Sequence, residues 1–196
     1  MAVSIKLSLE VVIHIYGDLS MGLFRKIADI AEKIDYHISD DPQIVGQRFE
    51  DHVESLFSTK YFPIEHKTHS FKTNEKRYVE SSLKPDFIFR YKPTGERFAV
   101  ECKYRSSLNS EDMLEWSSPQ QLQRYRQFEY ENRIPVFIVI GLEGVMEDDY
   151  EGEESVTFMF NIPLNAAKYP KLYPSVFEKY ERPYDKPFFW KNGVLY

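Results

Sequence analysis

The sequence has almost no cysteine and no long apolar segment. Its one cysteine, Cys102, cannot form an intramolecular disulfide, and no Cys-x-x-Cys pair or neighbouring histidine suggests a structural zinc site. The most apolar N-terminal run, LSLEVVIHIYGDL, is interrupted by Glu10 and is shorter than the roughly 20 residues that a membrane helix needs. It also lacks the basic start and the cleavage site of a signal peptide. We therefore expect a cytoplasmic protein without a membrane or targeting segment.

Several function classes lack their sequence motifs. The chain has no GxxxxGK[ST] or GxGxxG phosphate loop, which argues against ATP hydrolysis, and no locally supported Ser/His/Asp arrangement for nucleophilic catalysis. The formal net charge of -6 argues against a protein that coats nucleic acid by charge alone. The local distribution of charge is therefore more informative than the total.

The hydrophobic pattern predicts one main domain of mixed α/β structure. A chain of 196 residues with 42% hydrophobic residues can bury one substantial core. Helical spacing of apolar residues predicts helices over 20–36, 41–59 and 118–130, and Asp41 and Pro42 suit the cap and first position of the second helix. Strands are expected near 64–71 and in DFIFRY, RFAVECKY, PVFIVIGL and SVTFMFNI. The aromatic segment from Lys168 onward has no clear period, and its structure stays unassigned.

Three charged residues stand at one end of the hairpin that DFIFRY and RFAVECKY are expected to form through the turn KPTGE. A turn centred near residues 93 and 94 places Asp86 opposite Glu101, and strand alternation places Glu101 and Lys103 on one face, roughly 7 Å apart. Cys102 then points the other way, into the core. Two carboxylates beside an ammonium suit a hard divalent cation, best Mg²⁺, with a lysine that positions or deprotonates an attacking water. The pattern therefore predicts phosphodiester hydrolysis.

Pro85-Asp86 followed by Glu101-Cys102-Lys103 resembles the signature of the PD-(D/E)XK nuclease superfamily, which has the restriction-endonuclease-like fold. The run GQRFEDHVESLF is similar to the first core helix of that superfamily, whose glutamate often reaches the metal, and here this residue is Glu50. Downstream, Gln121 and Tyr125 lie four apart in QLQRY, which resembles the Q-x-x-x-Y motif of the RecB-type branch.

The resemblance implies a core of αβββαβ order with a central mixed sheet of four to five strands flanked by helices. It implies a nuclease core over 41–162. A helical extension over 1–40 and an aromatic tail over 163–196, which we expect to pack on the core, lie outside the resemblance. Asp86, Glu101, the Cys102 carbonyl and Glu50 would bind Mg²⁺, which Mn²⁺ would replace, and Lys103 would orient or activate the water. Gln121 and Tyr125 would hold the lysine or a substrate phosphate.

Each of these residues also has a purely structural interpretation. Asp86, Glu101 and Lys103 can form a cross-strand ion pair on an exposed sheet face. Glu50 can be a solvated residue of a helix face, and Tyr125 can pack against the sheet. Gln121 follows Ser118 by three residues, which also fits a capping box.

The resulting hypothesis is a Mg²⁺-dependent nuclease that hydrolyses DNA, with RNA left open as a substrate. Between residues 60 and 105 the chain has 11 Lys and Arg against six Asp and Glu, an excess of positive charge around the motif that suits a phosphate backbone. The tail aromatics can stack on unpaired bases, pack across the domain or form a dimer contact. The alternatives are a catalytically silent module that binds nucleic acid or protein, and a purely structural protein. A homodimer or a larger nucleic-acid-processing complex is compatible with each of them.

Overall fold

The computed structural model describes residues 41–68, 84–146 and 154–196. The chain divides into two compact units between Ile44 and Val45, and all but four residues of the first unit lie outside the described part. The expected helix over 20–36 and the extension over 1–40 therefore also lie outside it.

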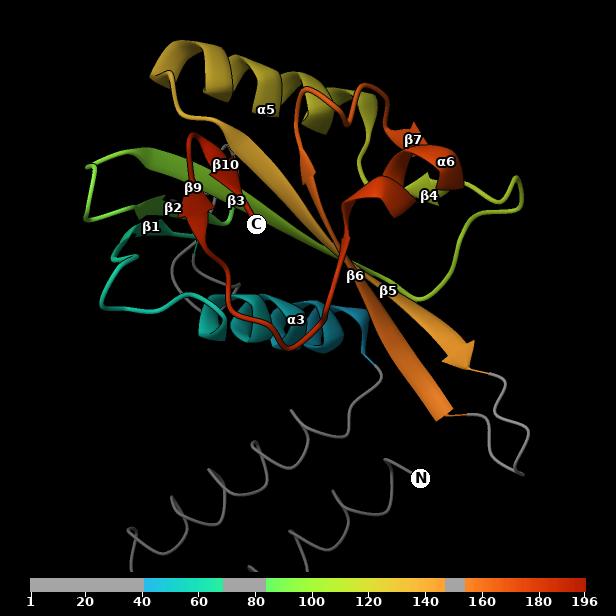
Figure 1. The fold of residues 1–196 in the computed structure, drawn as a ribbon. Coiled ribbons are helices and arrows are strands. Elements are labelled where there is room, and N and C mark those ends of the chain that lie inside the picture. Colours follow the sequence, from blue (N-terminus) through green and yellow to red (C-terminus); the bar gives the residue numbers. More distant parts are fainter. Residues whose placement is uncertain (1–40, 69–83, 147–153) are drawn as a thin grey trace, which may run out of the picture. The chain divides into compact units, whose positions relative to one another are not determined.

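A six-stranded sheet organises the second unit, with the strand order β1-β2-β3-β5-β6-β8 (Figure 1). Neighbouring strands are antiparallel except for β3 and β5, which are parallel. A parallel pair needs a crossover, and here the connection contains helix α5 (Pro119–Asn132). The strands are β1 (Ile64–Lys67), β2 (Phe87–Arg90), β3 (Arg97–Arg105), β5 (Val136–Met146), β6 (Glu154–Pro163) and β8 (Glu181–Arg182).

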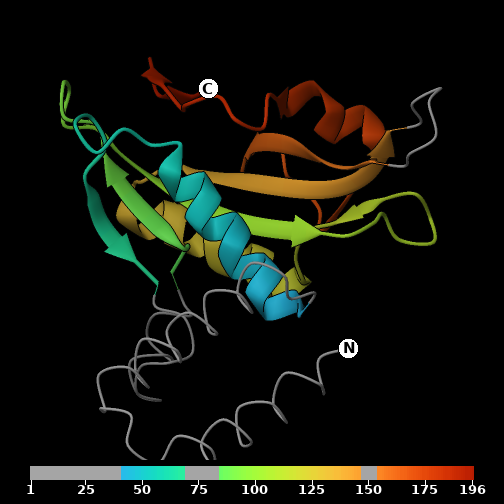
Figure 2. The same cartoon turned by 90° about the horizontal axis from the view of Figure 1, so that it is seen from below.

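Helices α3 (Pro42–Ser55) and α5 cover opposite faces of this sheet (Figures 1 and 2). The first turn of α3 is capped as expected, because the Asp41 carboxylate accepts a hydrogen bond from the Gln43 backbone N–H at 2.8 Å. α3 ends at Ser55 instead of near residue 59. The backbone N–H groups of Leu56 and Phe57 donate to the carbonyls three residues earlier, and both side chains are buried. The buried stripe of α3 otherwise agrees with the sequence pattern.

The two faces of the sheet carry separate hydrophobic clusters. On the α3 face, aromatic rings dominate, and Phe57 stacks on Phe89 at a centroid distance of 4.1 Å. On the α5 face, aliphatic residues of β5 and β6 pack against Leu122, Tyr125 and Phe128. Central strand β5 is therefore covered on both sides, which is why PVFIVIGL is continuously apolar.

The C-terminal segment adds elements to the same unit. β8 extends the main sheet by pairing with β6, and a two-stranded ribbon pairs β4 (Leu114–Glu115) with β7 (Lys171–Leu172). Helix α6 (Pro174–Phe177) and the 3-10 turn η1 (Glu178–Tyr180) lead to β8, and β9 (Trp190–Lys191) with β10 (Val194–Leu195) form a closing hairpin.

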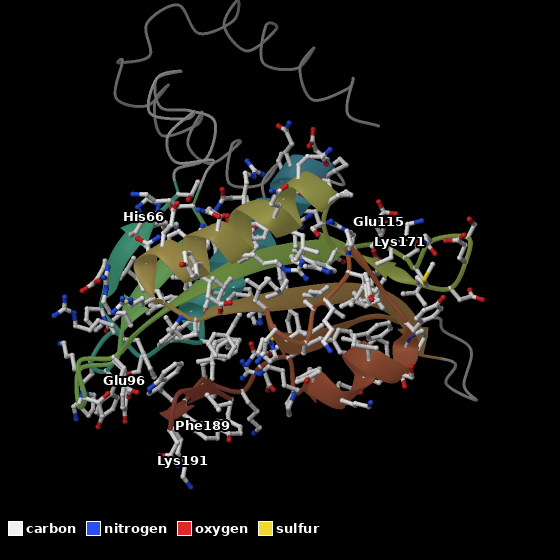
Figure 3. All side chains as sticks on the ribbon, turned by 90° about the horizontal axis from the view of Figure 1, so that it is seen from above. His66, Glu96, Glu115, Lys171, Phe189 and Lys191 are labelled. Carbon is white, nitrogen blue, oxygen red and sulfur yellow. The ribbon has the colours of Figure 1, made fainter. Side chains whose placement is uncertain are left out.

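Two aromatics of this segment belong to the α3-side core. Trp190 stacks on Phe98 at a centroid distance of 4.6 Å, and its indole N–H donates to Glu96 at 2.8 Å. Phe188 is 3% exposed, whereas Phe189 is 55% exposed and stacks on Tyr196 (Figure 3 labels Glu96 and Phe189). Phe188 and Trp190 thus serve packing, whereas Phe189 and Tyr196 are exposed.

The predicted fold class is confirmed: the molecule is α/β, with a mixed central sheet and helices on both faces. The main elements follow the expected αβββαβ order as α3, β1, β2, β3, α5 and β5. The sheet has six strands instead of four to five because β6 and the short β8 both join it. Among the described residues, no helix combines the length and the apolar character that crossing a bilayer requires.

Candidate active site

The register of the β2-β3 hairpin brings Asp86 and Glu101 together. Phe87 pairs with Val100 and Arg90 with Arg97, so the position just before β2 lies opposite Glu101, as predicted. Asp86 is fixed there by a hydrogen bond from the Cys102 backbone N–H to its Oδ2 at 2.8 Å. This leaves Oδ1 of the same carboxylate without a hydrogen bond in the described part of the chain.

Glu101 is a buried carboxylate with two donors. It is 3% exposed and lies on the α5 face of β3. Lys103, two residues further along the strand, lies on the same face. The Lys103 ammonium forms an ion pair with Glu101 Oε1, and the hydroxyl of Tyr125 on α5 donates to the same oxygen at 2.5 Å. The exposed ion-pair interpretation is therefore wrong, because α5 covers this part of the sheet face.

Tyr125 is held in place by packing. Its ring is 4% exposed and lies against Trp116, with 6.1 Å between the ring centroids and 22° between the planes. Burial, and then the charge of Glu101, raise the pKa of Tyr125 above its usual value, so the phenol keeps its proton and remains a donor. Among the described residues the Tyr125 hydroxyl binds the Glu101 oxygen that also binds Lys103, and no hydrogen bond joins the tyrosine and the lysine directly.

The carboxylates and the lysine influence one another's charge. Burial, and next the charge of Glu101, raise the pKa of Asp86 well above its usual value. Burial alone would lower the pKa of Lys103, but Glu101 and Asp86 raise it above its usual value. The two carboxylates thus favour the charged form of Lys103, which suits it to orienting and to charge stabilisation.

Glu50 reaches this site from α3. It forms no hydrogen bond or ion pair in the described residues, yet burial and then the Glu101 charge raise its pKa to about 7. Lys103 acts on it in the opposite direction. The Glu50 carboxyl is half-buried and its pKa responds to the charges of Glu101 and Lys103, which differs from a fully solvated helix-face glutamate.

The donor chemistry of the site suits a hard cation, although no complete side-chain cage is present. Among the described residues, no group of three or more His, Cys, Asp and Glu side chains is arranged to hold a metal ion. Asp86 and Glu101 nevertheless each keep one carboxylate oxygen without a hydrogen bond in this part of the structure. Mg²⁺ is commonly bound through only one or two carboxylates, with water and phosphate completing the shell. The two residues and the Cys102 carbonyl therefore fit this ion in ligand type.

Gln121 forms the capping box that the sequence allowed. Its backbone N–H donates to Ser118 Oγ at 3.2 Å, and its side-chain Oε1 accepts from the Ser118 N–H at 3.0 Å. In the described part of the structure, the side chain makes no hydrogen bond to Lys103 or Tyr125. Gln121 and Tyr125 thus share a helix face but are not in one hydrogen-bond network.

Part of the excess positive charge predicted around the motif is paired within the fold where it is described. Arg90 and Arg97 both bind Glu65, at the turn end of the hairpin and away from Asp86. Lys67 binds Glu54 at 2.5 Å. Arg90, Arg97 and Lys67 are therefore neutralised within the fold, whereas Lys84, two residues before Asp86, is exposed.

Two site contacts were not predicted from the sequence. The amide of Cys102, instead of its thiol or carbonyl, orients Asp86, and only the hairpin register could have indicated it. The pairing of Tyr125 with Glu101 joins residues 24 positions apart and has no local sequence signal.

Comparison with protein-family models finds no match, and neither does comparison with curated proteins. Among solved structures, the chain is similar to Hjc of Archaeoglobus fulgidus, described as a Holliday junction resolvase from an archaeal hyperthermophile. The TM-score is 0.45 and the sequence identity 14%, and the match covers 74% of this chain and 98% of that one. A similarity of this size does not by itself establish a shared function.

Proposed function

We propose that this protein is a metal-dependent nuclease of the PD-(D/E)XK superfamily that hydrolyses phosphodiester bonds in DNA. The observation that supports this most directly is the convergence of Asp86, Glu101 and Lys103 at the open end of the hairpin. Both carboxylates are held by donors from neighbouring elements, Cys102 N–H and Tyr125 O–H. The half-buried Glu50 carboxyl, whose pKa responds to Glu101 and Lys103, is further support.

In this proposal Asp86, Glu101 and the Cys102 carbonyl bind Mg²⁺, with Mn²⁺ as a substitute, and Glu50 contributes from α3. The bound ion supplies charge neutralisation at the phosphate and a water of lowered pKa. Tyr125 fixes the direction of the Glu101 carboxylate, whose other oxygen, without a hydrogen bond among the described residues, would be available to hold the ion. Membership in the RecB-type branch is a further part of the proposal.

Lys103 carries a positive charge next to the carboxylates and acts on the substrate as a cation. It orients the attacking water or the scissile phosphate and stabilises the negative charge that develops there. Its ion pair with Glu101 favours this role over proton removal. Hydrolysis adds water across one P–O bond, so a fixed cation lowers the cost of bringing a nucleophile to the charged phosphate.

A second candidate is a catalytically silent module that binds nucleic acid or protein with the same fold. One observation favours it: Lys103 and Tyr125 both bind Glu101 Oε1, so half of this carboxylate is already satisfied inside the protein. The two candidates differ in whether Mg²⁺ binds at Asp86.

The test is cleavage of linear, circular and single-stranded DNA, and of RNA, by the full chain with Mg²⁺, Mn²⁺ or EDTA. Asp86→Asn and Glu101→Gln keep the size of the side chains and remove their charges. We expect activity to fall about a thousandfold in both, since several kcal/mol of transition-state stabilisation are lost with the ion. The matched control is Glu111→Gln, an exposed carboxylate paired with Lys171, which should cleave like the wild type.

Equal cleavage by wild type and Asp86→Asn would contradict the assignment of the site. If the wild type cleaves none of the substrates and a calorimetric titration detects no Asp86-dependent Mg²⁺ binding, the nuclease proposal is wrong, and the catalytically silent module is the remaining candidate. Circular dichroism of each variant shows whether a loss of activity is a loss of folding.

A further inference from the structure

The end of the edge strand β1 places Thr68 directly opposite Asp86. Lys67 pairs with Phe87, and at the next position the Thr68 N–H donates to the Asp86 carbonyl at 2.8 Å. Residues opposite each other in an antiparallel pair have their Cβ atoms about 5 Å apart on one face of the sheet. The Thr68 side chain is therefore the neighbour of Asp86 on the β1 side, as Glu101 is on the β3 side.

His66 lies on the same sheet face, two residues before Thr68. It pairs with Ile88, which belongs to the α5-side cluster, and strand alternation places Thr68 on that face as well. Both side chains are half-buried, and His66 is labelled at this edge of the sheet in Figure 3. The face that carries Asp86 and Glu101 thus continues to the edge strand through a threonine and a histidine.

These two side chains form a hydrogen-bond chain that ends at the residue before Asp86. The Thr68 hydroxyl donates to the Pro85 carbonyl at 3.3 Å, and His66 Nε2 lies 3.4 Å from the same hydroxyl oxygen. A hydroxyl has one proton, so a threonine that donates to the carbonyl accepts from the histidine. The Nε2–H group is present in one neutral tautomer and in the imidazolium, so the chain does not depend on a charge of the ring.

Thr68 holds the main chain on both sides of the Asp86 Cα. Pro85 is buried and has no backbone N–H, so its carbonyl is its one backbone group for hydrogen bonding. The Thr68 hydroxyl binds this carbonyl, and the Thr68 N–H binds the carbonyl of Asp86 itself. From the other neighbouring strand, the Cys102 N–H binds the Asp86 carboxylate at 2.8 Å. Asp86 is therefore fixed by its main chain from β1 and by its side chain from β3.

We propose that Thr68 and His66 are positioning residues that fix Asp86 for the divalent cation. The inference deepens the proposed function and rests on it for the cation. The Asp86 Oδ1 has no hydrogen bond among the described residues, and its direction follows from the backbone at Asp86 and from the bond of Oδ2 to Cys102. Thr68 limits the backbone rotation that would turn Oδ1 away, and His66 fixes the rotamer of Thr68.

The experiment measures the position of Asp86 and the binding of the cation separately. In EDTA, the chemical shift of the Cys102 amide proton reports its hydrogen bond to Asp86, because a weaker bond moves this signal upfield. Without EDTA, calorimetric titration of the full chain with Mn²⁺ measures the affinity for the ion. Both readouts are independent of cleavage.

Thr68→Val keeps the shape of the side chain and removes the hydroxyl. We expect Mn²⁺ affinity to fall about tenfold, as for the loss of a group that orients a metal ligand, and the Cys102 signal to move upfield. Thr68→Ser keeps the hydroxyl and should restore both values, which a purely steric effect would not explain. His66→Phe keeps a ring and removes the donor, so it should change both values in the same direction and by less.

The matched control is Thr94→Val. The Thr94 hydroxyl donates to Glu96 at 2.6 Å near the turn of the β2-β3 hairpin, so the same substitution removes a hydroxyl bond away from Asp86. Its Mn²⁺ affinity should stay within about twofold of the wild type, and its Cys102 signal should not move.

Wild-type Mn²⁺ affinity and an unmoved Cys102 signal in Thr68→Val would overturn the proposal. Either change without the other would also overturn it, because Thr68 would then not act on the ion through Asp86. If Thr68→Val fails to fold, His66→Phe gives the same two readouts with the threonine in place. A wild type that binds no Mn²⁺ contradicts the proposed function, whereas the Cys102 signal in EDTA still decides whether Thr68 positions Asp86.

Discussion

The ion pair between Lys103 and Glu101 should respond differently to single and double substitution. Removing one partner should destabilise the fold strongly, whereas replacing both partners with neutral residues should change the free energy of unfolding little. Lys103→Met leaves the Glu101 carboxylate, 3% exposed, with Tyr125 as its remaining donor. Breaking a buried pair by removing one partner costs about 3–5 kcal/mol. The lysine side chain is 18% exposed, so water reaches its end, and we expect the lower value, about 3 kcal/mol.

The double variant Lys103→Met, Glu101→Gln removes both charges and keeps an acceptor for the tyrosine. Its free energy of unfolding should lie within about 1 kcal/mol of the wild-type value, because burying a neutral pair of similar volume does not carry the cost of removing two charges from water. The coupling energy of the cycle would then be about 2 kcal/mol or more. Guanidinium denaturation in EDTA, followed by circular dichroism, measures all four proteins.

An exposed pair of the same chemistry is the matched control. Lys171 binds Glu111 at 3.2 Å, with side chains 44% and 60% exposed, and Lys171→Met should cost less than about 1 kcal/mol. If Lys103→Met costs no more than this control, Glu101 is not buried as described, and the covering of the site by α5 is wrong.

Three further substitutions probe the supports of the site. Tyr125→Phe keeps the ring and removes one hydrogen bond to Glu101, so we expect a loss of about 1.5 kcal/mol in denaturation and slower cleavage from a less well-oriented carboxylate. Gly141→Ala places a Cβ 2.6 Å from the Phe49 ring and should destabilise by about 1–3 kcal/mol, and an unchanged melting temperature would disprove this close packing. Gln121→Glu retains a capping-box side chain, so its melting temperature should stay near that of the wild type, and a clear decrease would contradict the capping box.

The hairpin part of the site was predictable because it depends on local rules. A short turn and a period of two residues fix which position faces Asp86, and they also fix the common face of Glu101 and Lys103. The N-terminal caps of the two helices, at Asp41 and Ser118, were likewise predictable, since a cap depends on residues within one helical turn. The structure confirms all of these.

The surroundings of the site depend on packing between distant segments, which short patterns do not encode. Burial of Glu101 requires α5 to cover β3, and the same contact decides that Tyr125 binds a carboxylate instead of a lysine. The arginines at 90 and 97 counted as positive charge in the sequence, but the fold pairs both with Glu65. β8 consists of only two residues, both charged, and therefore has no alternation of apolar and polar residues by which to predict it.

The outer strands of the described sheet also bear on self-association. β8 consists of Glu181 and Arg182 alone, and β1 has four residues with an irregular register between Ile64 and His66. Short, charged or bulged edges offer a poor template for another strand, which protects a sheet from continuous growth. Within the described part of the chain, two molecules are therefore poorly suited to joining their sheets edge to edge, and an assembly would have to form through side chains on another surface.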